Sequence, residues 1–226
     1  MSYKGPVELH VLDFTKEDLK PGTNSWLSAC KSVRHAFEEH GCFVVVYDKA
    51  SSFDLQNGVF GSLKDLFDLP TETKMKNIYE GSTSYLLRVL AHKAPEDSMP
   101  QLGFVSHTDK SFTTILHQNH VNALMVETKD GNWIDVDFSS PASFVVMAGD
   151  ALMVWSNDRI KSPIHKVVMN GNETRYSLGL FAFYKGILEV PEELIDDEHP
   201  LQYKPFDHLA LLNFTYSAHI KAYCGV

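Results

Sequence analysis

The sequence predicts a mainly β protein with flanking helices, and three observations carry this prediction. Beyond residue 82, short runs of β-branched and aromatic residues follow one another closely. Apolar residues at helical spacing are confined to two stretches before residue 70. The 226 residues, of which 44% are hydrophobic, suit one domain with an enclosed core. Together these features favour a sandwich, barrel or jelly roll over a parallel α/β sheet.

Two helices and one strand are expected in the first third of the chain. The first helix covers residues 25–40, and Gly41 provides its C-terminal stop. A short buried strand follows at residues 42–47. The second helix covers residues 52–67 and ends before Leu69-Pro70, since the residue before a proline disfavours helix. The apolar positions that define these two helices are Trp26, Cys30, Val33, Phe37, Leu55, Phe60, Leu63 and Phe67.

Short strands, followed by a tail, are expected in the rest of the chain. The strands cover residues 85–90, 112–116, 123–127, 133–136, 143–147, 151–155 and 176–184. Asp130-Gly131, between two of them, is a strong hairpin signal. The tail from residue 190 is acidic at first and then aromatic and basic. Trp133 and Trp155 are expected to be core residues. We expect turn or surface positions, and no role as metal ligands, for Asp135, Asp137 and Asp150.

Composition and charge exclude several classes of function. With 29 acidic against 20 basic side chains, the formal charge is −9. This disfavours nucleic acid as a partner, because that affinity rests on Lys and Arg neutralising phosphates. The apolar stretches are too short to span a bilayer, and no signal-peptide pattern is seen. Three cysteines without a CxxC spacing are typical of reduced thiols. We therefore expect a cytoplasmic protein that binds neither nucleic acid nor membranes.

His107 and Asp109 begin a pattern that suits a metal ion. On an extended segment, residues two apart point to the same side, so both can reach one ion. Alone, the pair is weak evidence and is more typical of a surface histidine near a loop aspartate. His165 lies in an apolar β region downstream, and two histidines with one carboxylate form the facial triad of non-haem Fe(II) sites. Ten residues later, Arg175 and Ser177 share a strand face, where a guanidinium fork and a hydroxyl can bind a carboxylate.

With these residues in this order, the chain resembles the plant Fe(II)/2-oxoglutarate-dependent dioxygenases, a superfamily that includes anthocyanidin synthase and the gibberellin oxidases. The resemblance covers most of the chain and is closest to the branch that acts on glucosinolate side chains. The resemblance to the superfamily rests on residues 29–43, on the Leu-Pro-Thr-Glu-Thr-Lys stretch at 69–74 and on residues 84–184. The resemblance to the glucosinolate branch rests on residues 82–88, 172–181 and 221–225.

The resemblance implies a double-stranded β-helix (jelly roll) core with helices packed outside. His107, Asp109 and His165 would hold Fe(II), and the far carboxylate of 2-oxoglutarate would pair with Arg175 and Ser177. The reaction would use O₂, with ascorbate in support, and release succinate and CO₂. The organic substrate would be hydroxylated, desaturated or dealkylated. A further residue, Phe181, resembles a substrate-lining position, although plain core packing is an equally good interpretation.

The sequence departs from the family in two places. Where the family has a Tyr that hydrogen-bonds 2-oxoglutarate, fifteen residues before the first metal-binding His, this chain has His92, whose imidazole N–H can replace the phenol as donor. We expect its protonation between pH 8 and 6 to strengthen that contact. The second departure is a joint at residues 76–82, where several tens of residues of the family pattern are missing. Their loss is expected to expose apolar surface, so that the chain is a weakly stable monomer or self-associates through that surface.

The resulting division of the chain is an N-terminal helix and strand region at 1–80, a jelly-roll core at 81–190 and a tail packed on it at 191–226. The leading function is an Fe(II)/2-oxoglutarate oxygenase acting on a small plant metabolite. The alternative is a truncated, non-catalytic metal-binding member of the same family. A cupin isomerase or thiol dioxygenase is disfavoured, because those proteins lack an Arg-x-Ser ten residues beyond the last histidine ligand.

Overall fold

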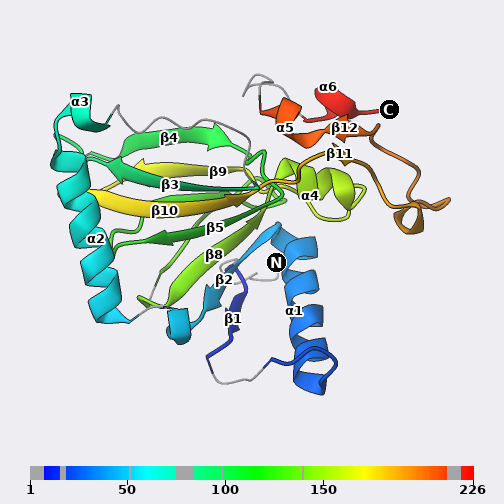
Figure 1. The fold of residues 1–226 in the computed structure, drawn as a ribbon, viewed down its shortest axis with the longest axis horizontal. Coiled ribbons are helices and arrows are strands. Elements are labelled where there is room, and N and C mark those ends of the chain that lie inside the picture. The colour runs from blue at the N-terminus through cyan, green and yellow to red at the C-terminus, as the bar shows by residue number, and fades with distance from the viewer. Residues whose placement is uncertain are drawn as a thin grey trace, which may run out of the picture.

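The computed structural model describes residues 8–15, 19–50, 52–74, 84–97, 99–138, 140–212 and 220–226. Within them, a larger sheet of six strands faces a smaller sheet of four, with helices outside (Figure 1). The larger sheet has the spatial order β1 (Val11–Asp13), β2 (Cys42–Val46), β8 (Ser143–Ala148), β5 (Thr113–Gln118), β10 (Arg175–Ala182) and β3 (Tyr85–His92). The smaller has the order β4 (Gln101–His107), β9 (His165–Met169), β6 (Leu124–Glu127) and β7 (Trp133–Asp135).

Strand pairing is antiparallel throughout these two sheets except between β1 and β2. A further pair, β11 (Ile187–Leu188) and β12 (Phe206–Asp207), lies near the C-terminus. The helices are α1 (Asn24–His40), α2 (Phe53–Asp68), α3 (Thr71–Lys74), α4 (Asp150–Trp155), α5 (His208–Leu211) and α6 (Ile220–Cys224), with single 3₁₀ turns at Asp48–Ala50 and Glu192–Leu194. Two facing, mainly antiparallel sheets are the jelly-roll architecture that was expected.

The alternation of side chains along β8 shows how the sheets and helices share the core. Val145 and Met147 are fully buried and pack between the sheets, against Leu124 and Val126 of β6. Val146 points to the opposite face, where it packs against the cluster that α1 contributes. One face of the larger sheet therefore closes the jelly roll, and the other accepts helices.

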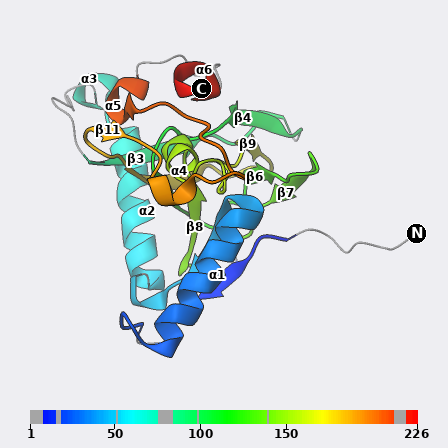
Figure 2. The ribbon, with the colours of Figure 1, turned by 90° about the vertical axis from the view of Figure 1, so that its right-hand side faces the viewer.

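The two long helices cover the outer face of the larger sheet. Ala36 of α1 is fully buried against Phe43 of β2. At the other end of the sheet, Phe60 of α2 lies 5.4 Å from His117 of β5, measured between ring centroids. In Figure 2, α2 lies on one side of the molecule and the smaller sheet's β4 and β7 lie on the other. Both helices were expected from the sequence within two residues of these bounds.

Residues 151–155 were expected to form a strand, and this prediction is wrong. They belong to α4, whose N-cap is Gly149. Residues 151–154 are all buried, so their apolar pattern has no period that separates a helix from a strand. Two neighbouring expectations are also wrong: Trp155, expected in the core, is 41% exposed, whereas Asp150, expected on the surface, is buried.

The C-terminal segments pack on the core through α4. Ala151, Met153 and Val154 form one buried cluster with apolar residues of the later segments, namely Leu188, Val190, Tyr203, Phe206, Leu211, Ile220 and Cys224. Figure 1 shows α5, α6 and the β11–β12 pair gathered beside α4. The ordered tail thus has its own hydrophobic contact with the end of the jelly roll.

The first two strands after the joint at 76–82, β3 and β4, are edge strands of the larger and the smaller sheet, and both carry exposed apolar side chains. On β3 they are Tyr85 and Leu87, and on β4 they are Leu102, Phe104 and Val105, each at least 40% exposed. The expectation that apolar surface is exposed here is met, although the joint itself, at 76–82, lies outside the described residues. In the described part of the chain, no helix is both long and apolar enough to cross a membrane.

Candidate active site

Three predicted metal ligands meet at one end of the smaller sheet. His107 is the last residue of β4 and His165 the first of β9, and the two are direct partners in the antiparallel register. Their ring centroids are 4.2 Å apart. Oδ1 of Asp109 is 3.7 Å from Nε2 of His107 and 3.8 Å from Nε2 of His165. One potential ligand atom of each residue lies within 4.8 Å of the other two.

Backbone carbonyls orient both imidazoles. Nδ1 of His107 is 2.9 Å from the Val105 carbonyl oxygen, and Nδ1 of His165 is 3.1 Å from that of Pro163. Since a carbonyl only accepts, each Nδ1 must carry the proton and donate. The lone pair of each imidazole is therefore on Nε2, the atom that faces Asp109.

The carboxylate of Asp109 is held by its own contacts. Its Oδ2 accepts a 2.6 Å hydrogen bond from Thr114, whose hydroxyl also contacts Ser111. The backbone carbonyl of Asp109 accepts from the N–H of Asp150, at the start of α4. Gly149 is required at this junction, because a Cβ there would lie 1.8 Å from the Ser111 carbonyl oxygen.

The three groups fit a divalent cation and disfavour an empty site. Asp109 and His165 are 8% and 5% exposed, so water does little to screen them. Burial, and then the neighbouring His165, lower the pKa of His107, which keeps its imidazole neutral at pH 7. Two imidazole nitrogens and a carboxylate oxygen then converge on one space. An Fe(II) ion accepts this set of ligands.

The predicted anchor Arg175 is the first residue of β10 and is only 2% exposed. Its Nε donates to Oε1 of Gln118 at 2.9 Å, and its Nη1 donates to Oγ of Ser177 at 3.2 Å. Among the described residues no carboxylate pairs with it, and burial lowers the pKa of Arg175 to about 10. A buried guanidinium with only neutral partners is costly unless a ligand supplies the anion.

His92 is the direct partner of Arg175 across β3 and β10. Its Nδ1 is buried and finds no hydrogen-bond partner among the described residues. Burial, and then the charge of Arg175, lower the pKa of His92 to about 4. The imidazole therefore stays neutral between pH 8 and 6, and the expected change in its protonation over that range is wrong. Its orphaned nitrogen remains suited to a polar ligand.

One cavity of about 300 Å³ joins these two groups of residues. The metal ligands lie in its wall together with Arg175, Ser177 and His92, so every predicted site residue faces the same space. Phe181 also lines the cavity, and the guanidinium of Arg88 lies 5.4 Å from its ring centroid. The cavity is of the size that small-molecule sites have in proteins.

The sequence interpretation missed Thr114 and Gln118, both fully buried residues of β5. Thr114, Leu116 and Gln118 are spaced two residues apart along β5, so their side chains point to the same inner face of the sheet. Polar side chains on the inner face of a strand were a usable signal for a site. The particular contact between Gln118 and Arg175 joins positions 57 apart, and no local pattern predicts it.

Comparison with known proteins agrees with this geometry. The model of the 2OG-Fe(II) oxygenase superfamily matches residues 75–183, and that of the non-haem dioxygenase N-terminal region matches residues 9–102. The probable 2-oxoglutarate-dependent dioxygenase AOP1 of Arabidopsis thaliana is 33% identical over 291 aligned positions, covering 92% of this chain and 96% of the relative. Since 92% of 226 residues is about 208, about 80 of those positions have no counterpart in this chain.

Two solved structures share the fold. The dioxygenase for auxin oxidation from rice superposes with a TM-score of 0.78 at 22% identity, covering 97% of this chain and all of that one. The complex of an Arabidopsis thaliana dioxygenase for auxin oxidation with 2-oxoglutarate gives a TM-score of 0.70 at 20% identity, covering 85% and 100%. The chain therefore belongs to the 2OG-Fe(II) oxygenase superfamily, the 2-oxoglutarate-dependent dioxygenases that use Fe(II) and 2-oxoglutarate.

Proposed function

We propose that this chain oxidises a small plant metabolite by hydroxylation, desaturation or dealkylation, in a reaction that converts 2-oxoglutarate and O₂ to succinate and CO₂. His107, Asp109 and His165 hold the iron. Arg175 and Ser177 bind the far carboxylate of 2-oxoglutarate, and His92 takes the position of the family tyrosine. The protein acts in the cytoplasm, as a monomer or as a self-associating species.

The observation that carries this proposal is the uncompensated guanidinium of Arg175 in the cavity that also contains the metal ligands. A dicarboxylate that reaches from the metal to Arg175 supplies the missing anion at one end and metal ligands at the other. The orphaned Nδ1 of His92 lies beside that path and can hydrogen-bond the same molecule. A site that bound metal alone would need neither group.

Bound iron supplies the redox chemistry with O₂, and the chain's residues position the reactants. The carbonyl contacts of His107 and His165 fix both rings so that only Nε2 faces the ion. Thr114 holds Asp109 in place through Oδ2 and leaves Oδ1 toward the histidines. Phe181, in the cavity wall, lines the space for the organic substrate, and its contact with Arg88 fixes the orientation of its ring.

The alternative, a non-catalytic metal-binding member, is favoured by the positions of AOP1 that have no counterpart here. It is also favoured by the exposed apolar residues of β3 and β4. One assay separates the two functions: succinate formation from 2-oxoglutarate, with Fe(II) and ascorbate, across a panel of plant metabolites. We expect at least one metabolite to raise succinate formation above the substrate-free rate. If the protein binds 2-oxoglutarate but no metabolite raises succinate formation above the substrate-free rate, the alternative function is supported.

A further inference from the structure

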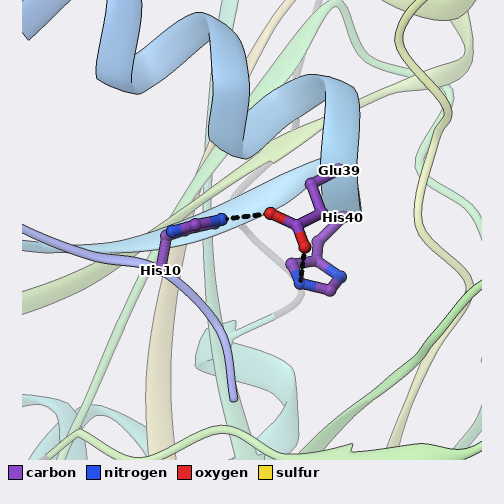
Figure 3. A group of neighbouring side chains, drawn as sticks. All are labelled: His10, Glu39 and His40. Carbon is purple, nitrogen blue, oxygen red and sulfur yellow. Dashed lines mark hydrogen bonds and ion pairs between the residues drawn. The ribbon is translucent and has the colours of Figure 1, made fainter. Parts of the chain in front are cut away.

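A second group of metal-binding side chains lies away from the active site, where the segment before β1 meets the end of α1 (Figure 3). His10 precedes β1, and Glu39 and His40 are the last two residues of α1. Nε2 of His10 is 2.5 Å from Oε2 of Glu39. Nε2 of His40 is 3.7 Å from the other oxygen, Oε1. A potential ligand atom of each residue lies within 4.8 Å of the other two.

The backbone holds these three residues in place. The carbonyl of His10 accepts a 2.8 Å hydrogen bond from the N–H of Val44, which ties it to β2. Gly41 ends α1 with a φ of 69° and donates its N–H to Phe37. A Cβ on Gly41 would lie 2.1 Å from the Lys161 carbonyl oxygen, so this turn after His40 requires glycine. The fold therefore fixes the backbone positions from which these three side chains meet.

We propose that His10, Glu39 and His40 form a second site for a divalent cation of the Zn(II) type. Two imidazoles and one carboxylate are ligands that zinc accepts, with water in the fourth position. Bond lengths of about 2.0–2.2 Å place tetrahedral ligand atoms roughly 3.3 Å apart. The two contacts that Glu39 makes, at 2.5 and 3.7 Å, lie on either side of that value. Binding would replace the hydrogen bond between His10 and Glu39 with a bond from each side chain to the ion.

Burial distinguishes this group from an ordinary surface ion pair. The side chain of His40 is only 10% exposed, whereas those of His10 and Glu39 are 34% and 44% exposed. His35 adds a third imidazole, with Nε2 3.5 Å from Oε2 of Glu39. Across the described residues, only this group and the active-site triad bring three such ligands together. His120 and Glu173, by comparison, form a lone and largely exposed pair.

The site would act as a clamp on the N-terminal edge of the larger sheet. β1 is an edge strand of the larger sheet, and it pairs with its neighbour β2 over three residues only. An ion bound by His10 from one side and by the end of α1 from the other ties this edge strand to the helix. Because a ligand that binds only the folded state stabilises it by mass action, Zn(II) should raise the melting temperature.

The test is Zn(II) binding by calorimetry, with a competing chelator that keeps free metal at low micromolar concentration. All proteins carry Cys30→Ser, because Cys30 is an exposed thiol that can itself bind zinc. We expect two ions per chain in the parent, one in the active site and one at this cluster. His10→Ala and Glu39→Gln should each bind one ion, and Asp109→Ala should also bind one. The matched control His120→Ala should bind two.

The same proteins give a second readout in their thermal stability. At a free metal concentration about a hundredfold above the dissociation constant, Zn(II) should raise the melting temperature of Asp109→Ala by roughly 5–10 °C. The rise should disappear when Glu39→Gln is added. The proposal is overturned if the parent binds a single ion, or if His10→Ala and Glu39→Gln both retain two. If Asp109→Ala retains two ions while Glu39→Gln loses one, this site stands and the active-site ligand assignment fails.

Discussion

Replacing Arg175 with methionine should weaken 2-oxoglutarate binding by roughly a hundredfold or more, and it should change the stability of the ligand-free protein far less than an ordinary loss of a buried charged side chain. Burial lowers the pKa of Arg175 to about 10, from an ordinary value above 12. This corresponds to about 3 kcal/mol by which desolvation disfavours the cation. The variant removes that cost and keeps most of the side chain's volume. Gln118 and Ser177 then each lose a donor, and each loss costs about 1–3 kcal/mol. The free energy of unfolding should therefore lie between about 3 kcal/mol below and about 1 kcal/mol above that of the parent.

The loss in ligand binding follows from the hydrogen bonds that the guanidinium makes to a carboxylate. Each such charge-assisted bond contributes about 1.5–3 kcal/mol, so losing two weakens binding by roughly a hundredfold or more. Calorimetric titration of 2-oxoglutarate into Mn(II)-loaded protein measures this, and urea denaturation measures stability. Arg88→Met is the matched control, since Arg88 lines the same cavity, and it should retain binding. Unchanged affinity in Arg175→Met, or a loss of stability above about 3 kcal/mol, would refute the reasoning.

Three further predictions concern the metal ligands, His92 and the loop that carries Asp109. Asp109→Ala should greatly weaken binding of one Fe(II), Mn(II) or Co(II) because the triad loses its only anion; unchanged affinity by calorimetry would remove the assignment. The lowered pKa of His92 means that folding disfavours its protonation, so its contribution to stability is full above about pH 6.5 and is lost toward pH 4. His92→Gln should therefore lose less stability than the parent over that range, and equal urea midpoint shifts would contradict this. Gly149→Ala should lower both the melting temperature and metal affinity, because its Cβ meets the Ser111 carbonyl; parental values for both would show that the loop tolerates the change.

The proposed metal ligands and the proposed 2-oxoglutarate anchor could be selected from the sequence because their signals are local. His107 and Asp109 are two residues apart, as are Arg175 and Ser177, and strand geometry alone gives each pair a common direction. The structure brings His165, the third predicted ligand, beside these two through the pairing of β4 with β9. Resemblance to the family was needed to connect these pieces in one site, since nothing local links positions 107 and 175.

Other features depended on tertiary contacts that the sequence does not encode locally. α4 was mistaken for a strand because residues 151–154 are all buried, which removes the apolar period. β4 was not expected as a strand, since six of its seven residues are exposed and it follows no alternating pattern. The pKa of His92 reflects burial beside Arg175, 83 positions away in the chain, and only the register of β3 against β10 reveals that neighbour.

The most direct test of the central claim is an anaerobic titration of 2-oxoglutarate into Fe(II)-loaded protein, followed by visible absorption. Chelation of the iron by the keto acid gives a metal-to-ligand charge-transfer band. We expect the band to saturate at one 2-oxoglutarate per chain, to be absent in Asp109→Ala, and to require at least tenfold more 2-oxoglutarate in Arg175→Ala. A parent protein that binds iron but develops no band, or an Arg175→Ala protein that titrates like the parent, would contradict the account.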